Sequence, residues 1–150
     1  SQVQSRYPHV WLLVAGAPDA VFSRQVFPSH IERLGWLGYT PEADLPGLYA
    51  GAQVYVQPSQ EEGFGLTALE ALACGAPLIA ARAGALPEVA GEAALWFDPA
   101  RASQLAERLE RCLSDPALRA LLAEKGLARA QAFGWERPTE ALREVLQQCQ

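Results

Sequence analysis

Two glycines in the stretch PSQEEGFGLTALEALACG lie where a helix is predicted to begin, and this arrangement could bind a phosphate group. Gly63 and Gly65 have no Cβ, so their backbone can adopt a positive φ and a ligand can approach closely. The first amides of a helix have no intrahelical acceptor and lie at the positive end of the helix dipole. We therefore expect the amides of Leu66 and Thr67 to hold a diphosphate. A plain tight turn before a helix is the alternative.

Two carboxylates flank these amides. Glu62 and Glu70 are eight residues apart, and eight helical steps of about 100° return both side chains to a similar side. Carboxylates do not bind phosphate, but they accept hydrogen bonds from hydroxyl groups on either side of it. A nucleotide sugar has that layout, because its ribose and its hexose flank the diphosphate. The alternative is that both glutamates are solvated surface charges.

The positions of these residues depend on alternating strands and helices. Short apolar runs bounded by Gly and Pro predict strands at residues 9–16, 31–38, 53–59, 77–81 and 93–97. Helical spacing and end signals predict helices at residues 41–52, 65–75, 86–91, 101–113, 115–132 and 136–148. This order predicts one α/β domain over residues 1–150, with a parallel sheet flanked by helices. We expect the closing helices to cover the sheet, and Trp11, Trp36 and Trp96 to pack in the core.

Ligands of open parallel sheets bind beyond the carboxyl ends of the strands. Three segments follow strands in this way: the glycine-containing loop, GYT at residues 38–40, and RAGALPE at residues 82–88. Arg82 therefore lies where it could supply a positive charge to a phosphate, although an exposed loop arginine is the simpler interpretation.

Composition excludes several classes of function. A net charge of −5 and a pI near 5.0 disfavour both a nucleic-acid partner and an anionic membrane surface. Cys74, Cys112 and Cys149 are widely spaced, and only two histidines are present, so we expect no disulfide framework, no metal site and no cofactor. A reduced, cytoplasmic protein fits this pattern best. The chain shows neither a long apolar run nor a signal-peptide pattern, and its lack of methionine suggests that it begins within a longer protein.

The segment PSQEEGFGLTALEALACGAPLIAARAGALPEVAGEAALWFDP resembles the donor-binding core of the group 1 glycosyltransferases, which are retaining and use nucleotide sugars. The hallmark of that family is two glutamates separated by seven residues, as in Glu62-GFGLTAL-Glu70. The resemblance extends through LGWLGYTPEADLPGLYAGAQVYVQPS and DPALRALLAEKGLARAQAFGWE, and so covers nearly the whole chain. It implies the Rossmann-like C-terminal domain of a GT-B fold, in which two such domains face a cleft.

The resemblance also implies a role for each matching residue. Glu62 would contact hydroxyls of the transferred sugar near the reacting carbon, and it is the catalytic candidate. The backbone of Gly63, Phe64 and Gly65 would line the pocket for the sugar and the phosphates. Glu70 would accept hydrogen bonds from the ribose hydroxyls.

The remaining implied contacts complete the donor site. The amides of Leu66 and Thr67 would bind the diphosphate, and Tyr39 and Thr40 would lie near the base. The implied reaction transfers a hexose from a nucleoside diphosphate to an acceptor hydroxyl with retention of configuration, and such enzymes generally need no bound metal.

The chain departs from the family pattern in two ways. The resemblance implies that the N-terminal domain, which binds the acceptor glycan or lipid, is missing, and that the full-length enzyme could associate peripherally with a membrane. The first strand of the donor domain is missing as well, so we expect a gap, an altered order or a swapped strand in the sheet. The isolated chain is therefore expected to bind donor better than it catalyses transfer. A non-catalytic nucleotide or nucleotide-sugar binding module is the main alternative, and a GT-B epimerase is a weaker one.

Overall fold

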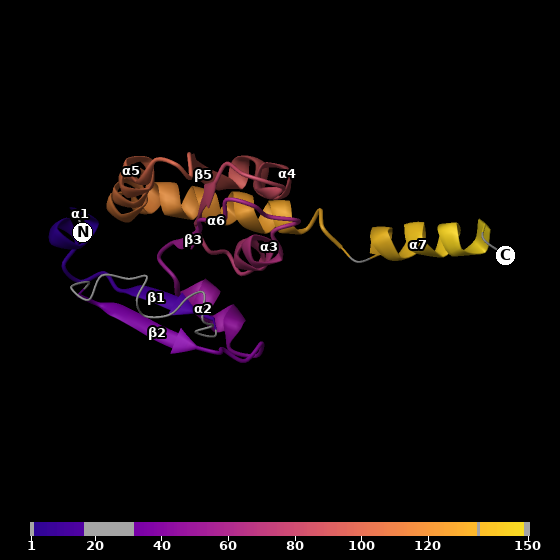
Figure 1. Ribbon diagram of the computed structural model, residues 1–150, viewed down its shortest axis with the longest axis horizontal. Coiled ribbons are helices and arrows are strands. Elements are labelled where there is room, and N and C mark those ends of the chain that lie inside the picture. Colours follow the sequence, from indigo (N-terminus) through magenta and orange to yellow (C-terminus); the bar gives the residue numbers. More distant parts are fainter. Residues whose placement is uncertain (1, 17–31, 135, 149–150) are drawn as a thin grey trace.

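The computed structural model describes residues 2–16, 32–134 and 136–148 (Figure 1). The described strands are β1 (Leu12–Ala15), β2 (Leu34–Gly38), β3 (Tyr55–Gln57), β4 (Leu78–Ala81) and β5 (Ala94–Phe97). The described helices are α1 (Gln2–Arg6), α2 (Leu45–Gly51), α3 (Leu66–Ala73), α4 (Leu86–Ala90), the 3-10 turn η3 (Gly91–Ala93), α5 (Ala102–Ser114), α6 (Pro116–Ala130) and α7 (Glu136–Gln148). Every predicted strand and helix is present, most of them shorter than predicted.

The described strands form two parallel sheets, which confirms the α/β class. One sheet pairs β1 with β2, and the other has the order β3-β4-β5. In the second sheet Tyr55 lies opposite Leu78, and Ile79 lies opposite Leu95. Figure 1 shows the two sheets apart, so the expected gap in the sheet is found between β1–β2 and β3–β5 among the described residues.

The core forms around β4, whose four residues are all fully buried. Successive side chains of a strand point to opposite faces, and the two faces of β4 meet different helices. Leu78 and Ala80 pack with residues of α3 and α4. Ile79 and Ala81 pack with residues of α5 and α6. Burial on both faces explains why β4 is apolar at every position rather than at alternate positions.

Strand β1 and the preceding Trp11 are largely exposed, contrary to the prediction that Trp11 packs in the core, whereas β2 is mostly half-buried. Trp11, Leu12 and Leu13 are 60%, 44% and 52% exposed, so Trp11 is not a core residue. The prediction assumed one continuous sheet covered by helices, whereas among the described elements β1 pairs with β2 alone. Trp36 and Trp96 are half-buried, and Trp96 packs against the core cluster around β4.

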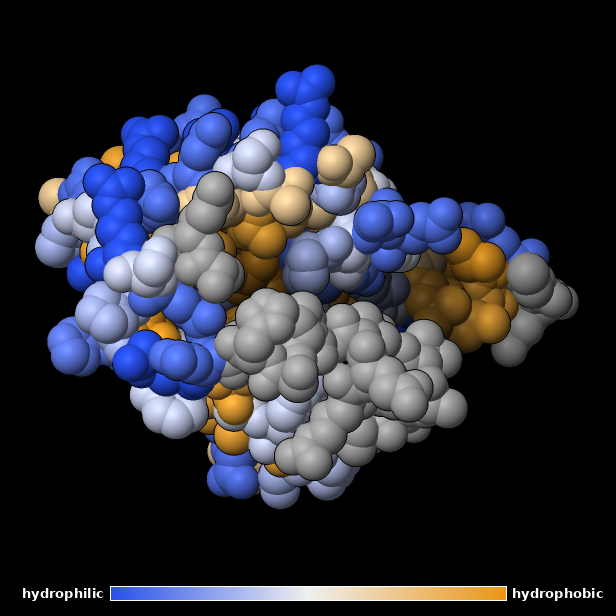
Figure 2. Space-filling view, turned by 60° about the vertical axis from the view of Figure 1, so that its left-hand side comes forward, coloured by the Kyte–Doolittle hydropathy of each residue, from blue (hydrophilic) through white to orange (hydrophobic). Residues whose placement is uncertain are grey.

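Of the closing helices, α5 and α6 cover the sheet and α7 does not. Asp115 caps α6 by accepting a hydrogen bond from the amide of Leu118 (2.9 Å), and Pro116 occupies the first turn, where a missing amide costs nothing. In contrast, α7 projects away from the rest of the molecule (Figure 1), and its apolar side chains form an exposed patch (Figure 2). The prediction that all closing helices cover the sheet was therefore wrong for α7.

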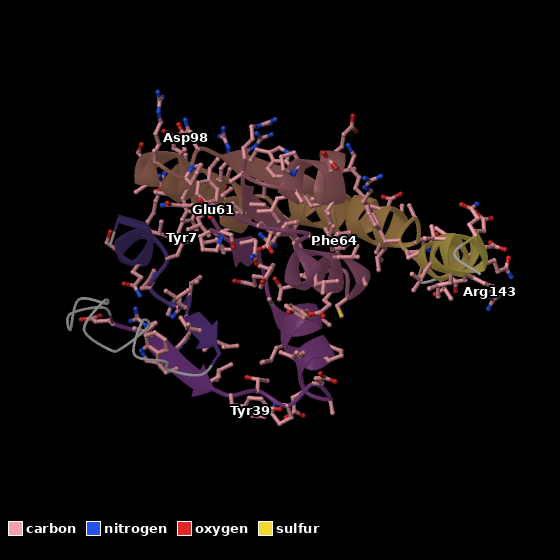
Figure 3. All side chains as sticks on the ribbon, turned by 45° about the vertical axis from the view of Figure 1, so that its right-hand side comes forward. Tyr7, Tyr39, Glu61, Phe64, Asp98 and Arg143 are labelled. Atoms are coloured by element: carbon pink, nitrogen blue, oxygen red, sulfur yellow. The ribbon has the colours of Figure 1, made fainter. Side chains whose placement is uncertain are left out.

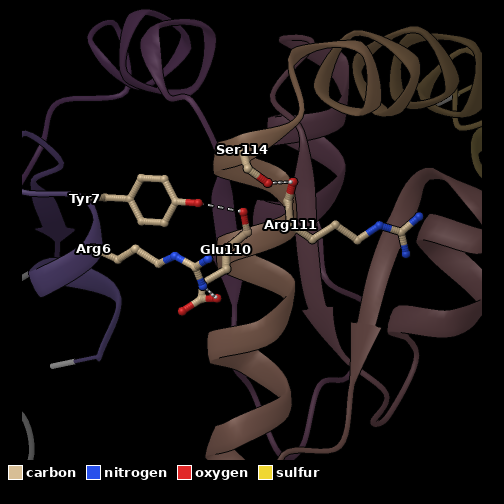
Figure 4. A network of polar contacts seen from close by, with 5 residues as sticks. All are labelled: Arg6, Tyr7, Glu110, Arg111 and Ser114. Atoms are coloured by element: carbon tan, nitrogen blue, oxygen red, sulfur yellow. Dashed lines mark hydrogen bonds and ion pairs between the residues drawn. The ribbon is translucent and has the colours of Figure 1, made fainter.

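The N-terminal helix α1, which was not predicted, is held against α5. Arg6 and Glu110 form an ion pair of 2.7 Å, and the Tyr7 hydroxyl donates to the carbonyl oxygen of Glu110 (3.2 Å) (Figure 4). A helix of five residues is too short for an amphipathic pattern, so these long-range contacts define it.

Candidate functional site

The glycine turn ends at the first exposed turn of α3. Gly65 has φ +93°, and the amide of Leu69 donates the first helical hydrogen bond to its carbonyl oxygen (3.0 Å). The amides of Leu66, Thr67 and Ala68 therefore have no intrahelical acceptor. Leu66 and Thr67 are exposed residues, which places this turn at the surface.

Only one of the two predicted glycines uses a left-handed conformation. Gly63 has no positive φ, and nothing lies within 4 Å of the position that a Cβ would occupy. A second left-handed glycine comes instead from the neighbouring loop. At Gly84 (φ +53°) a Cβ would lie 2.4 Å from the carbonyl oxygen of Glu62, and the amide of Ala85 donates to that same oxygen (3.0 Å). The backbone of Glu62 is thus positioned by the loop after β4.

A buried glutamine fixes the side chain of Glu62. Gln57 ends β3 and is 9% exposed. Its Nε2 donates to Oε2 of Glu62 (3.1 Å) and to Oγ of Ser59 (2.8 Å). Its Oε1 accepts from the hydroxyls of Tyr55 (2.6 Å) and Thr67 (3.2 Å). One amide therefore connects the Glu62 carboxylate to the first turn of α3.

The second carboxylate is held from the opposite helix, α2. The Tyr49 hydroxyl donates to Oε2 of Glu70 (3.2 Å), and the Tyr49 ring lies edge-on to Tyr55 with 5.2 Å between centroids. Burial raises the pKa of Tyr49 well above its ordinary value, and the neighbouring Tyr55 and Glu70 raise it further. Tyr49 therefore stays protonated and remains a donor to Glu70.

The negative charges of Glu62 and Glu70 both affect the pKa of one tyrosine, Tyr55. Burial is the main cause of the raised pKa of Tyr55, and a hydrogen bond with Thr67 opposes this shift. The negative charges of Glu70 and Glu62 each raise the pKa as well. The structure thus brings the two predicted glutamates into one neighbourhood, with Tyr55 beneath both of them.

The other predicted site residues lie elsewhere. Tyr39 is 78% exposed at the end of the two-stranded sheet, and Figure 3 shows it apart from Phe64. Thr40 donates to the carbonyl oxygen of Gly38 (3.5 Å). Their role near a base stays a prediction. Arg82 does not point to the glutamates, because its guanidinium lies over the Trp96 ring, 5.3 Å from the ring centroid.

Sequence reasoning missed Tyr49, Tyr55 and Gln57. One signal was present: Gln57 is a polar residue inside the apolar run VYVQ, at the carboxyl end of a strand. The tyrosines were not identified: the Tyr49 hydroxyl meets Glu70 only once α2 packs against α3, and the Tyr55 hydroxyl donates to Gln57 within β3. The described residues include no group of three or more His, Cys, Asp or Glu side chains that could bind a metal ion. Within the same part of the chain, no helix has the length and apolar character that a membrane crossing needs.

The chain matches a known protein family along most of its length. The family model described as "Glycosyl transferases group 1" matches residues 1–129. The O-antigen chain mannosyltransferase B of Escherichia coli is 39% identical over 141 residues, which are 92% of this chain and 36% of that protein. The chain therefore spans about a third of the length of this relative.

Solved structures of related proteins have the same fold. The sucrose-phosphate synthase of Thermosynechococcus elongatus is 31% identical, with a TM-score of 0.84 over 99% of this chain and 40% of that chain. Anabaena HepE in complex with UDP is 27% identical, with a TM-score of 0.78 over 94% of this chain and 42% of that chain. HepE has also been solved in complex with UDP-glucose.

Proposed function

Because this chain belongs to the group 1 glycosyltransferases, we propose that it is the donor-binding domain of a retaining enzyme that uses a nucleoside diphosphate sugar. One observation carries the proposal: Glu62 and Glu70 are both fixed by hydrogen bonds around the exposed first turn of α3. HepE, a structural neighbour, is known in complex with UDP and UDP-glucose, which supports a donor of this class.

In this proposal the diphosphate binds the first turn of α3. The amides of Leu66 and Thr67 donate to the phosphate oxygens, and the backbone of Gly63, Phe64 and Gly65 lines the pocket. The positive end of the helix dipole adds to the attraction, since the chain as a whole has a net charge of −5. The Thr67 hydroxyl is occupied by Gln57, so the contribution of Thr67 to the phosphate is its amide.

The two carboxylates accept hydrogen bonds from the hydroxyl groups on either side of the diphosphate. Glu70 accepts from the ribose, with Tyr49 donating to one of its oxygens and no described residue donating to the other. Glu62 accepts from the transferred hexose near the reacting carbon, with its orientation set by Gln57. Tyr39 and Thr40 are assigned to the base. Each carboxylate thus has a fixed geometry before the donor arrives, which reduces the cost of ordering it on binding.

The proposed reaction transfers a hexose to an acceptor hydroxyl with retention of configuration. The α3 amides would stabilise the negative charge that develops on the departing diphosphate, which is the main catalytic contribution of this domain. No metal or other cofactor takes part in this proposal. The acceptor, a glycan or a lipid, would be selected by parts of the enzyme outside this chain, which spans 36% of its Escherichia coli relative.

We further place the protein in the cytoplasm. Cys74 and Cys112 are free in the structure, and Cys112 is fully buried between α5 and the sheet. Burial raises the pKa of the Cys112 thiol, which keeps it in the unreactive thiol form.

The proposal is tested by calorimetric titration of the purified protein with UDP, GDP and ADP, followed by the glucose and mannose conjugates of the diphosphate that binds. We expect saturable binding of one diphosphate and tighter binding of one sugar conjugate. Absence of binding by all of these ligands would contradict a donor-binding role. Donor binding without transfer of the sugar by the full-length enzyme would instead indicate a binding module.

A further inference from the structure

A groove lined by arginines runs along β5 and the facing side of α5. Its volume is about 580 Å³, and it is lined by residues of β5 and of the loop that follows, which includes Asp98, together with Arg82, Gln104, Arg108 and Arg111. Arg82 comes from the end of β4, whereas Arg108 and Arg111 are one turn apart on α5. We call this feature the arginine groove, and it contains none of the residues of the proposed donor site.

Trp96 holds two of the three guanidinium groups in place. The Arg82 guanidinium lies over the indole ring, 5.3 Å from its centroid. Nε of Arg108 donates to the carbonyl oxygen of Trp96 (3.0 Å), and its two terminal nitrogens have no hydrogen bond to any described residue. The Trp96 indole nitrogen in turn donates to the carbonyl oxygen of Gly91 (3.1 Å), so the ring itself is fixed.

The third guanidinium is free of partners within the described part of the chain. Arg111 is exposed, and no hydrogen bond or ion pair joins its guanidinium to a described residue. Figure 4 shows its side chain extending away from Arg6 and Glu110, on the opposite side of α5. The acids four residues before and after it, Glu107 and Asp115, form no ion pair with it, and Glu110 is paired with Arg6 (2.7 Å).

The groove carries more positive charge than negative charge. Asp98 is the acidic residue of the lining, and it is engaged by Arg101 (3.3 Å) and by the amide of Ala100 (2.9 Å). The three lining arginines therefore give a local positive excess on a chain of net charge −5. Guanidinium groups present planar pairs of N–H donors that match the oxygens of a phosphate group.

We propose that the arginine groove binds a phosphate-bearing anion, which is either a soluble phosphate compound or the headgroup of an anionic lipid. The first turn of α3 offers backbone amides, whereas this groove offers guanidinium groups, two of which are positioned by Trp96. The inference is independent of the proposed donor site, because neither Glu62, Glu70 nor the first turn of α3 contributes to it.

The test compares the wild-type protein with the Arg82→Gln/Arg111→Gln double variant and with Arg143→Gln as the control. Arg143 is an exposed arginine on α7, outside the groove, so the control makes the same kind of charge change elsewhere. One arm titrates sodium pyrophosphate by calorimetry. The other measures cosedimentation with phosphatidylglycerol vesicles against phosphatidylcholine vesicles. We expect the double variant to weaken binding by about tenfold or more, because two charge-assisted hydrogen-bonding groups are lost, and the control to leave it unchanged.

The two arms identify the source of the phosphate. Groove-dependent binding of pyrophosphate alone indicates a soluble ligand, and groove-dependent binding of anionic vesicles alone indicates a lipid headgroup. Absence of binding in both arms, or a double variant that binds as many pyrophosphate ions as the wild type and binds them and the vesicles as tightly, would overturn the proposal. Arg111→Gln alone guards against misfolding: since this side chain contacts no described partner, the variant keeps its circular dichroism spectrum and still weakens binding several-fold.

Discussion

At the scale of single residues, the candidate site depends on one buried amide. Gln57 makes four hydrogen bonds, and its partners include both Glu62 and Thr67. An amide suits this position because it offers a donor to the Glu62 carboxylate and an acceptor to two hydroxyls. An apolar residue of similar size would leave those partners without hydrogen bonds near the floor of the site.

The first prediction concerns the substitution Gln57→Leu. It should lower the free energy of unfolding by about 1–3 kcal/mol, because Tyr55 and Thr67 lose a common acceptor in a buried setting. Urea denaturation followed by circular dichroism measures the loss. Gln53→Leu is the matched control, because Gln53 is exposed just before β3. An equal effect of the two substitutions would show that the network contributes nothing to stability.

The second prediction concerns pH and Tyr49. Burial raises the pKa of Tyr49 in the folded protein above its unfolded value of about 10. The unfolded state therefore loses this proton first as the pH rises, and the stabilising contribution present below pH 10 is lost progressively above it. Tyr55 acts in the same direction. We expect the free energy of unfolding to fall from about pH 10 upward, and to fall less steeply in Tyr49→Phe. Identical slopes in the two proteins would contradict the assignment.

Residue-scale prediction from sequence succeeded where a family pattern existed and failed where packing decides. The two glutamates and the turn at Gly65 follow from the motif and from the start of a helix. Tyr49 is 21 residues from its partner Glu70, and no periodicity connects the two. The conformation of Gly63 was predicted wrongly, because one left-handed residue is enough for this turn and the second left-handed glycine is Gly84.

At the scale of elements, the loop after β4 supports the loop after β3. The close approach of Gly84 to the backbone of Glu62 leaves no room for a side chain, and the amide of Ala85 completes the contact. These two loops lie at the carboxyl ends of neighbouring parallel strands, so the register of β3 against β4 sets their distance. The pairing of β3 with β4 therefore determines where Glu62 lies.

The third prediction compares two glycine-to-alanine substitutions. Gly84→Ala should destabilise the protein by more than about 1–2 kcal/mol, because positive φ alone costs that much and the new Cβ would also collide with the Glu62 carbonyl. Gly63→Ala should change stability little, because that position is open and has no positive φ. Thermal unfolding of both variants tests the difference. A larger loss in Gly63→Ala would contradict the described arrangement of the loops.

The type and order of the elements were largely predictable, and the exposure of several of them was not. Glycines and prolines divide the chain into short apolar runs, and the regular alternation of strands and helices predicts the parallel pairing. The exposure of Trp11 and of α7 depends on which surfaces meet which neighbours, and an apolar pattern alone does not contain that information. The apolar residues of α7 and of β1 are largely exposed although such residues are typical of buried elements.

At the scale of the whole molecule, binding capacity is divided between two places on an acidic chain. The first turn of α3 offers amides between two carboxylates, and the arginine groove offers three guanidinium groups on β5 and α5. The two sites favour different ligands. Hydroxyl groups beside the phosphate can donate hydrogen bonds to the glutamates, whereas a second anionic group can accept them from the arginines. The net charge of −5 keeps non-specific attraction of anions low, so both sites depend on local geometry.

The fourth prediction separates the roles of the two glutamates. Glu62→Ala should weaken binding of the intact sugar nucleotide and leave the free nucleoside diphosphate unaffected, because the proposal assigns Glu62 to the hexose. Calorimetry with both ligands on the same variant measures the difference. An equal loss for both ligands would contradict the sugar role and would place Glu62 against the nucleotide instead.

The most direct test of the central claim is the affinity of Glu70→Ala for the nucleoside diphosphate that the wild-type protein binds. Glu61→Ala is the control, because Glu61 is an exposed glutamate in the same segment, outside the hydrogen-bonded network. If Glu70 accepts from the ribose, its removal weakens binding by about 1–3 kcal/mol, while the control binds as tightly as the wild type. Unchanged affinity in Glu70→Ala would contradict the placement of the nucleotide on the first turn of α3.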